Sequence, residues 1–221
     1  MIQIHKFGVD FTVTPSTPSL DDFWRNIYQS SWETETFRDI LPHLDKNKTF
    51  IDIGAWQGPI SLVAQQYSKQ CLCFEPDPFA YKYLVQNVEL NKFDNIICEN
   101  VAVSAEKKLN IGAAELGGGV TSFTKSDNSI ECQTISIQQI FEKYKLTEDD
   151  VSVIKIDIEG YECELLKDPF WKTLNVNMHI SLHAPFFEDK LKYFTDLQEF
   201  FGAGYPFDID AQFQEIFIQK K

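Results

Sequence analysis

A loop that contains two glycines and an acid is the first segment whose residue types suggest chemistry. It runs Asp52-Ile53-Gly54-Ala55-Trp56-Gln57-Gly58, after a short apolar stretch and before a segment of helical character. Gly54 permits a sharp turn at the end of a strand, and Gly58 permits a ligand to approach the start of the helix. The loop is typical of a turn that holds a nucleotide-like cofactor, and tight turns without a ligand use glycine in the same way.

Two carboxylates indicate which cofactor the loop would hold. Glu75 follows the next predicted strand, about 20 residues beyond the loop, where an acid is placed to accept both hydroxyls of a ribose. Asp52, in the loop itself, would repel a pyrophosphate and favour a cation. S-adenosylmethionine carries an amino group and a sulfonium but no phosphate, so the charge pattern favours it over a dinucleotide. After the third predicted strand, Asn100 or Val101 is expected to meet the adenine, and Asn100 is equally well explained as a turn residue.

A second group of ionisable residues lies at the end of a later predicted strand. Asp157 and Glu159 alternate there, so their side chains face similar directions, at the same sheet edge as Asp52 if the strands are parallel. Asp157 is predicted to lie near the methionine part of the cofactor or near the acceptor. Glu159 is predicted to orient either an acceptor hydroxyl or a neighbouring residue. Lys155 is predicted to pair with a carboxylate and lower its pKa. The alternatives are that the acids only cap the next helix and that the lysine is solvated.

A histidine follows another predicted strand at the same edge. His183 is suited to general-base catalysis near neutral pH. His179 shares its face but lies further from the edge, so His183 is favoured as the catalytic residue. The alternative for His183 is a structural, hydrogen-bonded histidine. Phe186 and Phe187 follow, and they either wall the acceptor pocket or pack under a flap formed by the N-terminal residues.

Several blocks of sequence are read together with these candidate residues. The most specific is Ile154-Lys155-Ile156-Asp157-Ile158-Glu159-Gly160-Tyr161-Glu162, and the others cover 50–55, 74–77, 100–104 and, more weakly, 136–140. In this order they resemble the FkbM-like family of S-adenosylmethionine-dependent O-methyltransferases, over roughly residues 49–185. The resemblance implies methyl transfer from S-adenosylmethionine to a hydroxyl of a sugar, glycan or polyketide-like small molecule.

Three positions depart from the pattern of that family. Trp56 stands where the family usually has Asn, and Gln138 where it usually has Asp. Ser181 stands two positions before His183, where the family often has an acid. We therefore expect altered contacts at the methionine end of the cofactor and altered details of catalysis.

The elements that would position these residues alternate between strands and helices from residue 49 onward. This alternation predicts a Rossmann-like class I methyltransferase sheet, α/β, mostly parallel and with helices on both faces. Two short strands near 206–209 and 216–218 have no helix between them, so we expect a hairpin and one antiparallel C-terminal strand. Residues 1–45 are predicted to form a hairpin and a helical flap, and 46–221 the cofactor-binding domain. In the flap, Trp24 and Trp32 either stack on a sugar or pack in the core.

The overall composition narrows the classes of partner. The 33 acidic and 20 basic residues give a formal net charge of −13, which disfavours nucleic acid and acidic membrane surfaces. The five cysteines show no zinc or redox spacing, so reduced thiols and a cytoplasmic location are expected. The acids near the site would suit magnesium, but their spacing defines no cage and no metal site is predicted. The sequence fixes neither the acceptor nor the oligomeric state.

Three functions compete on this evidence. The favoured one is an O-methyltransferase for a small-molecule or glycan acceptor. A non-catalytic module that binds the cofactor or a partner protein is kept open by Trp56 and Ser181. A nicotinamide-dependent oxidoreductase is disfavoured by Asp52 and by the absence of a third glycine at dinucleotide-loop spacing.

Overall fold

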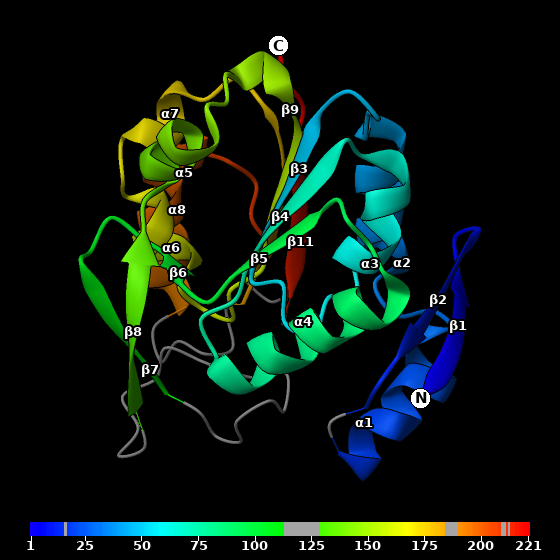
Figure 1. Ribbon diagram of the computed structural model, residues 1–221. Helices are drawn as coiled ribbons and strands as arrows, with labels where there is room; N and C mark the ends of the chain where they lie inside the picture. The colour runs from blue at the N-terminus through cyan, green and yellow to red at the C-terminus, as the bar shows by residue number, and fades with distance from the viewer. Residues whose placement is uncertain (16, 113–128, 184–189, 209–210, 212) are drawn as a thin grey trace.

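The computed structural model describes 1–15, 17–112, 129–183, 190–208, 211 and 213–221. Phe186 and Phe187 lie outside the described residues. The main body is a twisted sheet in the order β11–β10–β9–β3–β4–β5 (Figure 1). Its strands are β3 Thr49–Ile53, β4 Gln70–Phe74, β5 Ile96–Glu99, β9 Val151–Ile156, β10 Asn177–Leu182 and β11 Gln214–Ile218.

The pairing of these strands confirms the predicted fold class. Every neighbouring pair in the sheet is parallel except β10 with β11, which is antiparallel. The expected strand near 206–209 was wrong: residues 205–208 are not in a strand, and β11 pairs with β10 instead. The helix α8 Lys190–Phe201 lies between β10 and β11 in the chain. The two antiparallel strands are therefore joined by a helical segment and not by a tight turn.

The strand order reverses beside β3, and this places the candidate site. From β3 the chain proceeds outward to β4 and β5, and it later returns to β9 on the other side of β3. Loops leaving β3 and β9 therefore diverge and leave a crevice at the carboxyl ends of these strands. The register sets Asp52 beside Lys155 and Ile53 beside Ile156, so residues from the two motifs become neighbours.

Helices cover both faces of the sheet, as predicted (Figure 1). Since strand residues alternate between faces, Ile51 and Ile53 pack in one hydrophobic cluster and Phe50 in another. The helices on the first side are α5 Ile137–Tyr144, α6 Glu162–Leu166, α7 Phe170–Thr173 and α8; those on the second are α2 Thr34–Ile40, α3 Ser61–Ala64 and α4 Pro78–Asn91. Short 3-10 turns cover Leu41–His43, Gln65–Tyr67 and Glu148–Asp150.

The N-terminal segment packs directly against the second face. It consists of a hairpin, β1 Ile2–Lys6 with β2 Val9–Val13, then α1 Pro18–Asp22 and a π-helical turn Phe23–Tyr28. Trp24 and Tyr28 are fully buried in the same cluster as Phe50, and the Tyr28 hydroxyl donates to the Pro59 carbonyl at 2.5 Å. The segment thus shares a core with the sheet, and the division near residue 45 stays a prediction.

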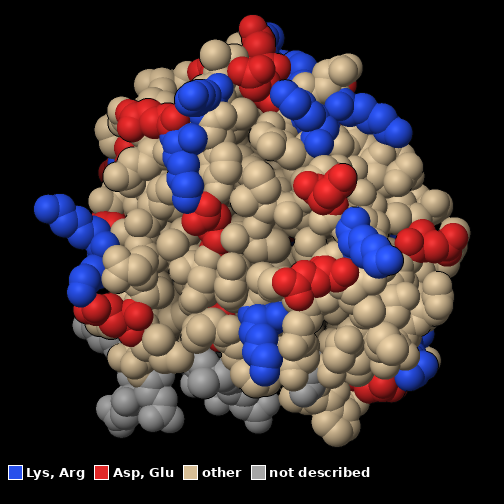
Figure 2. Space-filling model, in the orientation of Figure 1, with Lys and Arg blue, Asp and Glu red and all other residues tan. Residues whose placement is uncertain are grey.

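A second, smaller sheet has the order β6–β8–β7. Its strands are β6 Ala102–Val103, β7 Lys108–Gly112 and β8 Ser129–Ile135. On the face drawn in Figure 2, basic and acidic side chains are interspersed. Among the described residues, no helix has both the length and the apolar composition needed to span a membrane.

Candidate functional site

A cavity of about 410 Å³ lies at the carboxyl ends of the central strands, where the sequence places the site. The turn after β3 contributes Gly54 and Trp56 to its wall, and the segment after β4 contributes Glu75. The ends of β9 and β10 contribute Asp157 and His183. Ligand cavities in proteins commonly have volumes of roughly 300–1,000 Å³, so this one is large enough for a small molecule.

The glycine loop is tightly packed against its neighbours. Gly54 has a φ of +80°, and a Cβ there would lie 1.8 Å from the carbonyl oxygen of Asp157. Gly58 has a φ of +90°, and a Cβ there would lie 2.9 Å from Leu84 Cδ1. Glycine at position 54 is therefore required both by the backbone conformation and by the close approach of the loop after β9.

Glu75 is held in place by the loop that it faces. Its carboxylate accepts the backbone N–H of Trp56 at 2.7 Å and that of Asp77 at 2.8 Å. Burial raises the pKa of Glu75 to about 8, although both N–H groups act in the opposite direction. The side chain lines the cavity at the position expected of a ribose-binding acid, and that role stays a prediction.

Asp52 and Lys155 form a buried charged pair behind the loop. Lys155 Nζ lies 3.1 Å from Asp52 Oδ1, 3.1 Å from the Gly54 carbonyl oxygen and 3.3 Å from Asp157 Oδ2. Asp52 also accepts a hydrogen bond from Ser61 Oγ at 2.6 Å, is fully buried and does not line the cavity. The structure places it beneath the cofactor loop, and its influence on a cationic ligand stays a prediction. Lys155, by contrast, does line the cavity and pairs with carboxylates as predicted.

The segment after β5 contributes different residues from those predicted to meet the adenine. Asn100 Nδ2 donates to the carbonyl oxygens of Glu75, at 2.8 Å, and Pro76, at 3.1 Å. Asn100 therefore stabilises the turn after β4, in agreement with the second explanation given for it above, that of a turn residue. The wall of the cavity is formed there by Ala102 and Val103, while neither Asn100 nor Val101 lines it.

His183, Asp157 and Glu159 meet in the wall of the same cavity. His183 Nε2 lies 3.5 Å from Asp157 Oδ1 and 3.5 Å from Glu159 Oε2. On the other side of the ring, Nδ1 lies 2.8 Å from Oε1 of Glu162. Glu162 is fully buried and also accepts the N–H of Gly160 and the hydroxyl of Tyr193. The imidazole is thus fixed from behind, and its Nε2 is presented to two carboxylates.

The charges of this group shift one another's pKa values. Burial would raise the pKa of Asp157, but Lys155 and then His183 outweigh it and lower the pKa. Burial raises the pKa of Glu159 to about 7, against the effect of His183 and with that of Asp157. Burial would lower the pKa of His183, but the hydrogen bond to Glu162 and the charge of Asp157 raise it to about 9. His183 and Asp157 are therefore charged at neutral pH, whereas Glu159 titrates in that range.

Several residues of the cavity wall were not predicted from the sequence. They are Phe23 of the N-terminal segment, Glu33 immediately before α2, and Phe213 and Glu215 at the start of β11. Glu33 has a φ of +52°, as does Glu159, and such a conformation costs on the order of 1 kcal/mol for a residue with a side chain. An αL conformation at a non-glycine residue has no sequence signature, and only the fold brings these segments to the site.

Trp56 and Ser181, the two positions near the site that depart from the family pattern, both line the cavity. Trp56 stacks with Trp24 at a ring separation of 6.3 Å and meets Phe23 edge-on at 5.3 Å, so its ring belongs to the aromatic cluster of the N-terminal segment. Trp24 is buried in the core, whereas Trp32 lines the cavity. Ser181 lines the cavity too, and its hydroxyl has no hydrogen-bond partner within the described residues.

The fold and this crevice are those of class I methyltransferases. The chain belongs to the methyltransferase FkbM domain family, whose sequence pattern matches residues 44–209. The resemblance noted in the sequence is thereby confirmed.

Three proteins illustrate what the chain is similar to. The hexuronic acid methyltransferase AglP of Haloferax volcanii is 22% identical over 183 residues, which cover 82% of this chain and 73% of AglP. SMU.1697c of Streptococcus mutans, a methyltransferase by its description, whose structure is in complex with SAH, aligns with a TM-score of 0.52 and 12% identity over 85% of this chain and 97% of that one. An rRNA-methylase by description from Clostridium thermocellum aligns with a TM-score of 0.53 and 10% identity over 85% and 94%.

Proposed function

We propose that this protein is an S-adenosylmethionine-dependent O-methyltransferase that acts on a hydroxyl of a sugar, glycan or polyketide-like small molecule. The observation that carries the proposal is one cavity that joins two sets of residues. Gly54 and Glu75 lie along one part of its wall, and Asp157, Glu159 and His183 meet at another. A cofactor loop and a group able to accept a proton therefore face the same space.

The cofactor end of the cavity fits S-adenosylmethionine. Glu75 presents a carboxylate suited to ribose hydroxyls, and the Ser181 hydroxyl is unpartnered within the described residues. Asp157 is a carboxylate held charged by Lys155, so its negative charge favours a cationic group nearby. S-adenosylmethionine, when bound, supplies a methyl group on a positively charged sulfur. The structural likeness to a protein in complex with SAH is consistent with this choice.

The residues of the chain have separate roles in the proposed transfer. Lys155, Asp157 and the glycine loop hold the donor end, because they are linked by contacts of 3.1–3.3 Å. Glu159 accepts the proton of the acceptor hydroxyl as its oxygen forms the new bond to the methyl carbon and the carbon–sulfur bond breaks. His183, anchored by Glu162, orients Glu159 and Asp157. The main contribution of the protein is alignment, since the donor is already activated.

Other residues of the cavity wall suggest the class of acceptor. They include the aromatic rings of Phe23, Trp32 and Phe213 and the carboxylates of Glu33 and Glu215. Flat rings pack against the C–H faces of a sugar, and carboxylates accept hydrogen bonds from its hydroxyls. AglP is described as a hexuronic acid methyltransferase, which supports a sugar acceptor for this chain as well. The acids of the wall favour a neutral sugar hydroxyl over a uronate, because an anionic acceptor would be repelled.

Ligand binding and methyl transfer test the proposal directly. S-adenosylmethionine and S-adenosylhomocysteine are expected to raise the melting temperature, whereas NAD is expected to leave it unchanged. Glu75→Ala should remove most of the shift, because the variant loses the expected ribose contact. Transfer of a radiolabelled methyl group is then measured across neutral sugars, uronic acids, glycans and polyketide-like alcohols. A shift with NAD alone would contradict the proposed cofactor, and cofactor binding without transfer to any of these acceptors would favour the non-catalytic alternative.

The pH dependence of turnover distinguishes the two candidate bases. A base acts when it is deprotonated, so kcat/KM should be low in acid and rise as the pH passes the pKa of the base in the free enzyme. With Glu159 as base, the midpoint is expected near its pKa of about 7, and Glu159→Gln should remove this rise. A midpoint near 9 that persists in Glu159→Gln would instead assign the proton to His183.

A further inference from the structure

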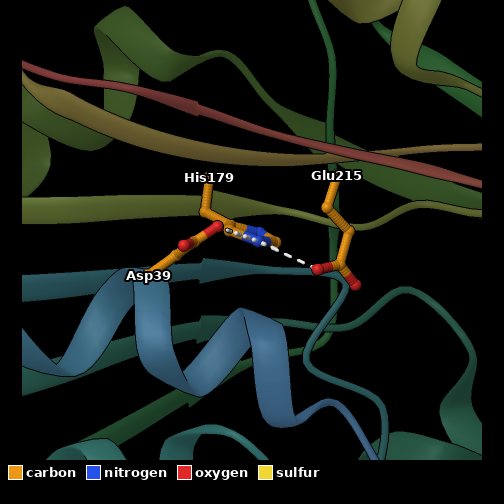
Figure 3. A group of neighbouring side chains, drawn as sticks. All are labelled: Asp39, His179 and Glu215. Carbon is orange, nitrogen blue, oxygen red and sulfur yellow. Dashed lines mark ion pairs between the residues drawn. The ribbon is translucent and has the colours of Figure 1, made fainter. Parts of the chain in front are cut away.

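A second group of ionisable side chains lies between the N-terminal segment and the last strand of the sheet. Asp39 comes from α2, His179 from β10 and Glu215 from β11. His179 Nε2 lies 3.6 Å from Asp39 Oδ2 and 3.7 Å from Glu215 Oε2, so the ring edge points between the two carboxylates (Figure 3). The ligand-type atoms of all three residues lie within 4.8 Å of one another.

His179 has no hydrogen bond to explain its position. Its side chain is fully buried, and neither ring nitrogen has a hydrogen-bond partner within the described residues. Both carboxylate distances exceed the roughly 3.2 Å that an N–H···O bond allows. Buried polar atoms are nearly always satisfied, so this imidazole requires a partner of another kind.

The distances match the spacing of ligands around a metal ion. Zinc binds histidine nitrogen and carboxylate oxygen at roughly 2.0–2.2 Å, so two ligands of a tetrahedral site lie about 3.4 Å apart. The two distances from Nε2 of His179 exceed this spacing by only a few tenths of an ångström, and the ligand atoms of all three residues lie within 4.8 Å of one another.

Charge and access also suit a cation. No lysine or arginine of the described ranges lies within ion-pair distance of Asp39 or Glu215, so with a neutral imidazole the group carries two uncompensated charges. The two carboxylate side chains are 38% and 31% exposed, which leaves an entry route and room for a water ligand. Thr36 donates to the other oxygen of Glu215 at 3.1 Å and so orients it, as residues behind metal ligands commonly do.

We propose that Asp39, His179 and Glu215 bind a divalent transition-metal ion, with zinc as the best match to this set of ligands. The ion would tie α2 to β11 and so fix two segments that carry Glu33 and Glu215 to the cavity wall. The site is distinct from the group of Asp157, Glu159 and His183. There Lys155, 3.3 Å from Asp157, already supplies a positive charge, and His183 Nδ1 is paired with Glu162.

Metal binding to the full chain, treated with a chelator and then dialysed, tests the proposal. Co²⁺ is the probe, because tetrahedral binding gives visible absorption bands, and Zn²⁺ competition measures the affinity of the natural candidate. The wild type is expected to bind one Co²⁺ per chain, and Zn²⁺ is expected to displace it. Asp39→Asn and Glu215→Gln, at partly exposed positions, should each weaken binding at least about tenfold, since even residues behind metal ligands contribute 10–100-fold.

Two matched variants keep the result specific. Glu35→Gln changes an exposed acid on the same helix and should leave Co²⁺ affinity unchanged. Asp157→Asn removes an acid from the other group and should also leave the bands in place. Circular dichroism and thermal melting verify that every variant is folded. Absence of Co²⁺ bands in the wild type, or bands lost in Asp157→Asn but kept in Asp39→Asn, would overturn the proposal.

Discussion

Alanine in place of Asp157 is expected to lower kcat/KM by at least about 100-fold, the scale on which a positioned charged group contributes to a reaction. Asp157 lies between Lys155 Nζ, at 3.3 Å, and His183 Nε2, at 3.5 Å. Without its carboxylate, these two groups would lose the negative charge that lies between them. We therefore expect weaker cofactor binding as well as slower turnover. Calorimetric titration with S-adenosylhomocysteine and steady-state kinetics measure the two effects separately.

An acid at the opposite end of the same strand provides the control. Asp149 lies in the 3-10 turn Glu148–Asp150 that leads into β9, and it pairs with Lys220 at the surface, with a side chain that is 89% exposed. Asp149→Ala should therefore leave turnover unchanged and stability nearly unchanged. If a folded Asp157→Ala variant matched this control in both affinity and turnover, our assignment of the catalytic group would be wrong.

Gly54→Ala is expected to lower the free energy of unfolding by about 3 kcal/mol or more. The new Cβ would lie 1.8 Å from the Asp157 carbonyl oxygen, which belongs to the backbone and cannot rotate away. A φ of +80° adds the strain of a left-handed conformation. Urea denaturation measures the loss of stability, and cofactor titration measures whether the displaced loop still binds.

Gly204 separates these two causes of instability. Its φ of +84° is close to that of Gly54, but a Cβ there would meet nothing within 4 Å. Gly204→Ala should therefore show only the strain, on the order of 1 kcal/mol. Equal losses in the two variants would mean that the contact between the loops after β3 and β9 contributes little, contrary to our interpretation.

Most of the main sheet could be predicted because its signals are local. Thr49–Ile53 and Val151–Ile156 are short apolar runs, and each is followed by a turn and a helix. The pairing of β11 was predicted less well. The sequence of β11 has the same strand pattern whether it pairs with the adjacent segment or with β10. The choice of partner depends on packing across the sheet.

The residues of the candidate site that lie within one sequence motif could also be predicted, whereas those distant in sequence could not. Lys155, Asp157 and Glu159 alternate within one motif, and the structure brings them to a common cavity with His183. Glu162 belongs to the same motif but was not among the predicted site residues. Its carboxylate accepts the backbone N–H of Ile158 and holds the ring of His183.

Other wall residues are far from the motifs in sequence. Glu33 and Glu215 meet the cavity only because α2 packs beside β10 and β11. Asn100 was ambiguous because the same amide suits a ligand and a turn. Its two carbonyl partners place it in the turn, and its contact with the adenine stays a prediction.

The cavity wall draws on residues from Leu20 to Glu215, nearly the full span of the described chain. A growing chain on the ribosome that has not yet released residue 215 would still lack the edge strand and the carboxylate that it carries. Partially synthesised molecules would then hold the glycine loop without a finished cavity wall. The cavity is thus completed only when the last strand joins the sheet.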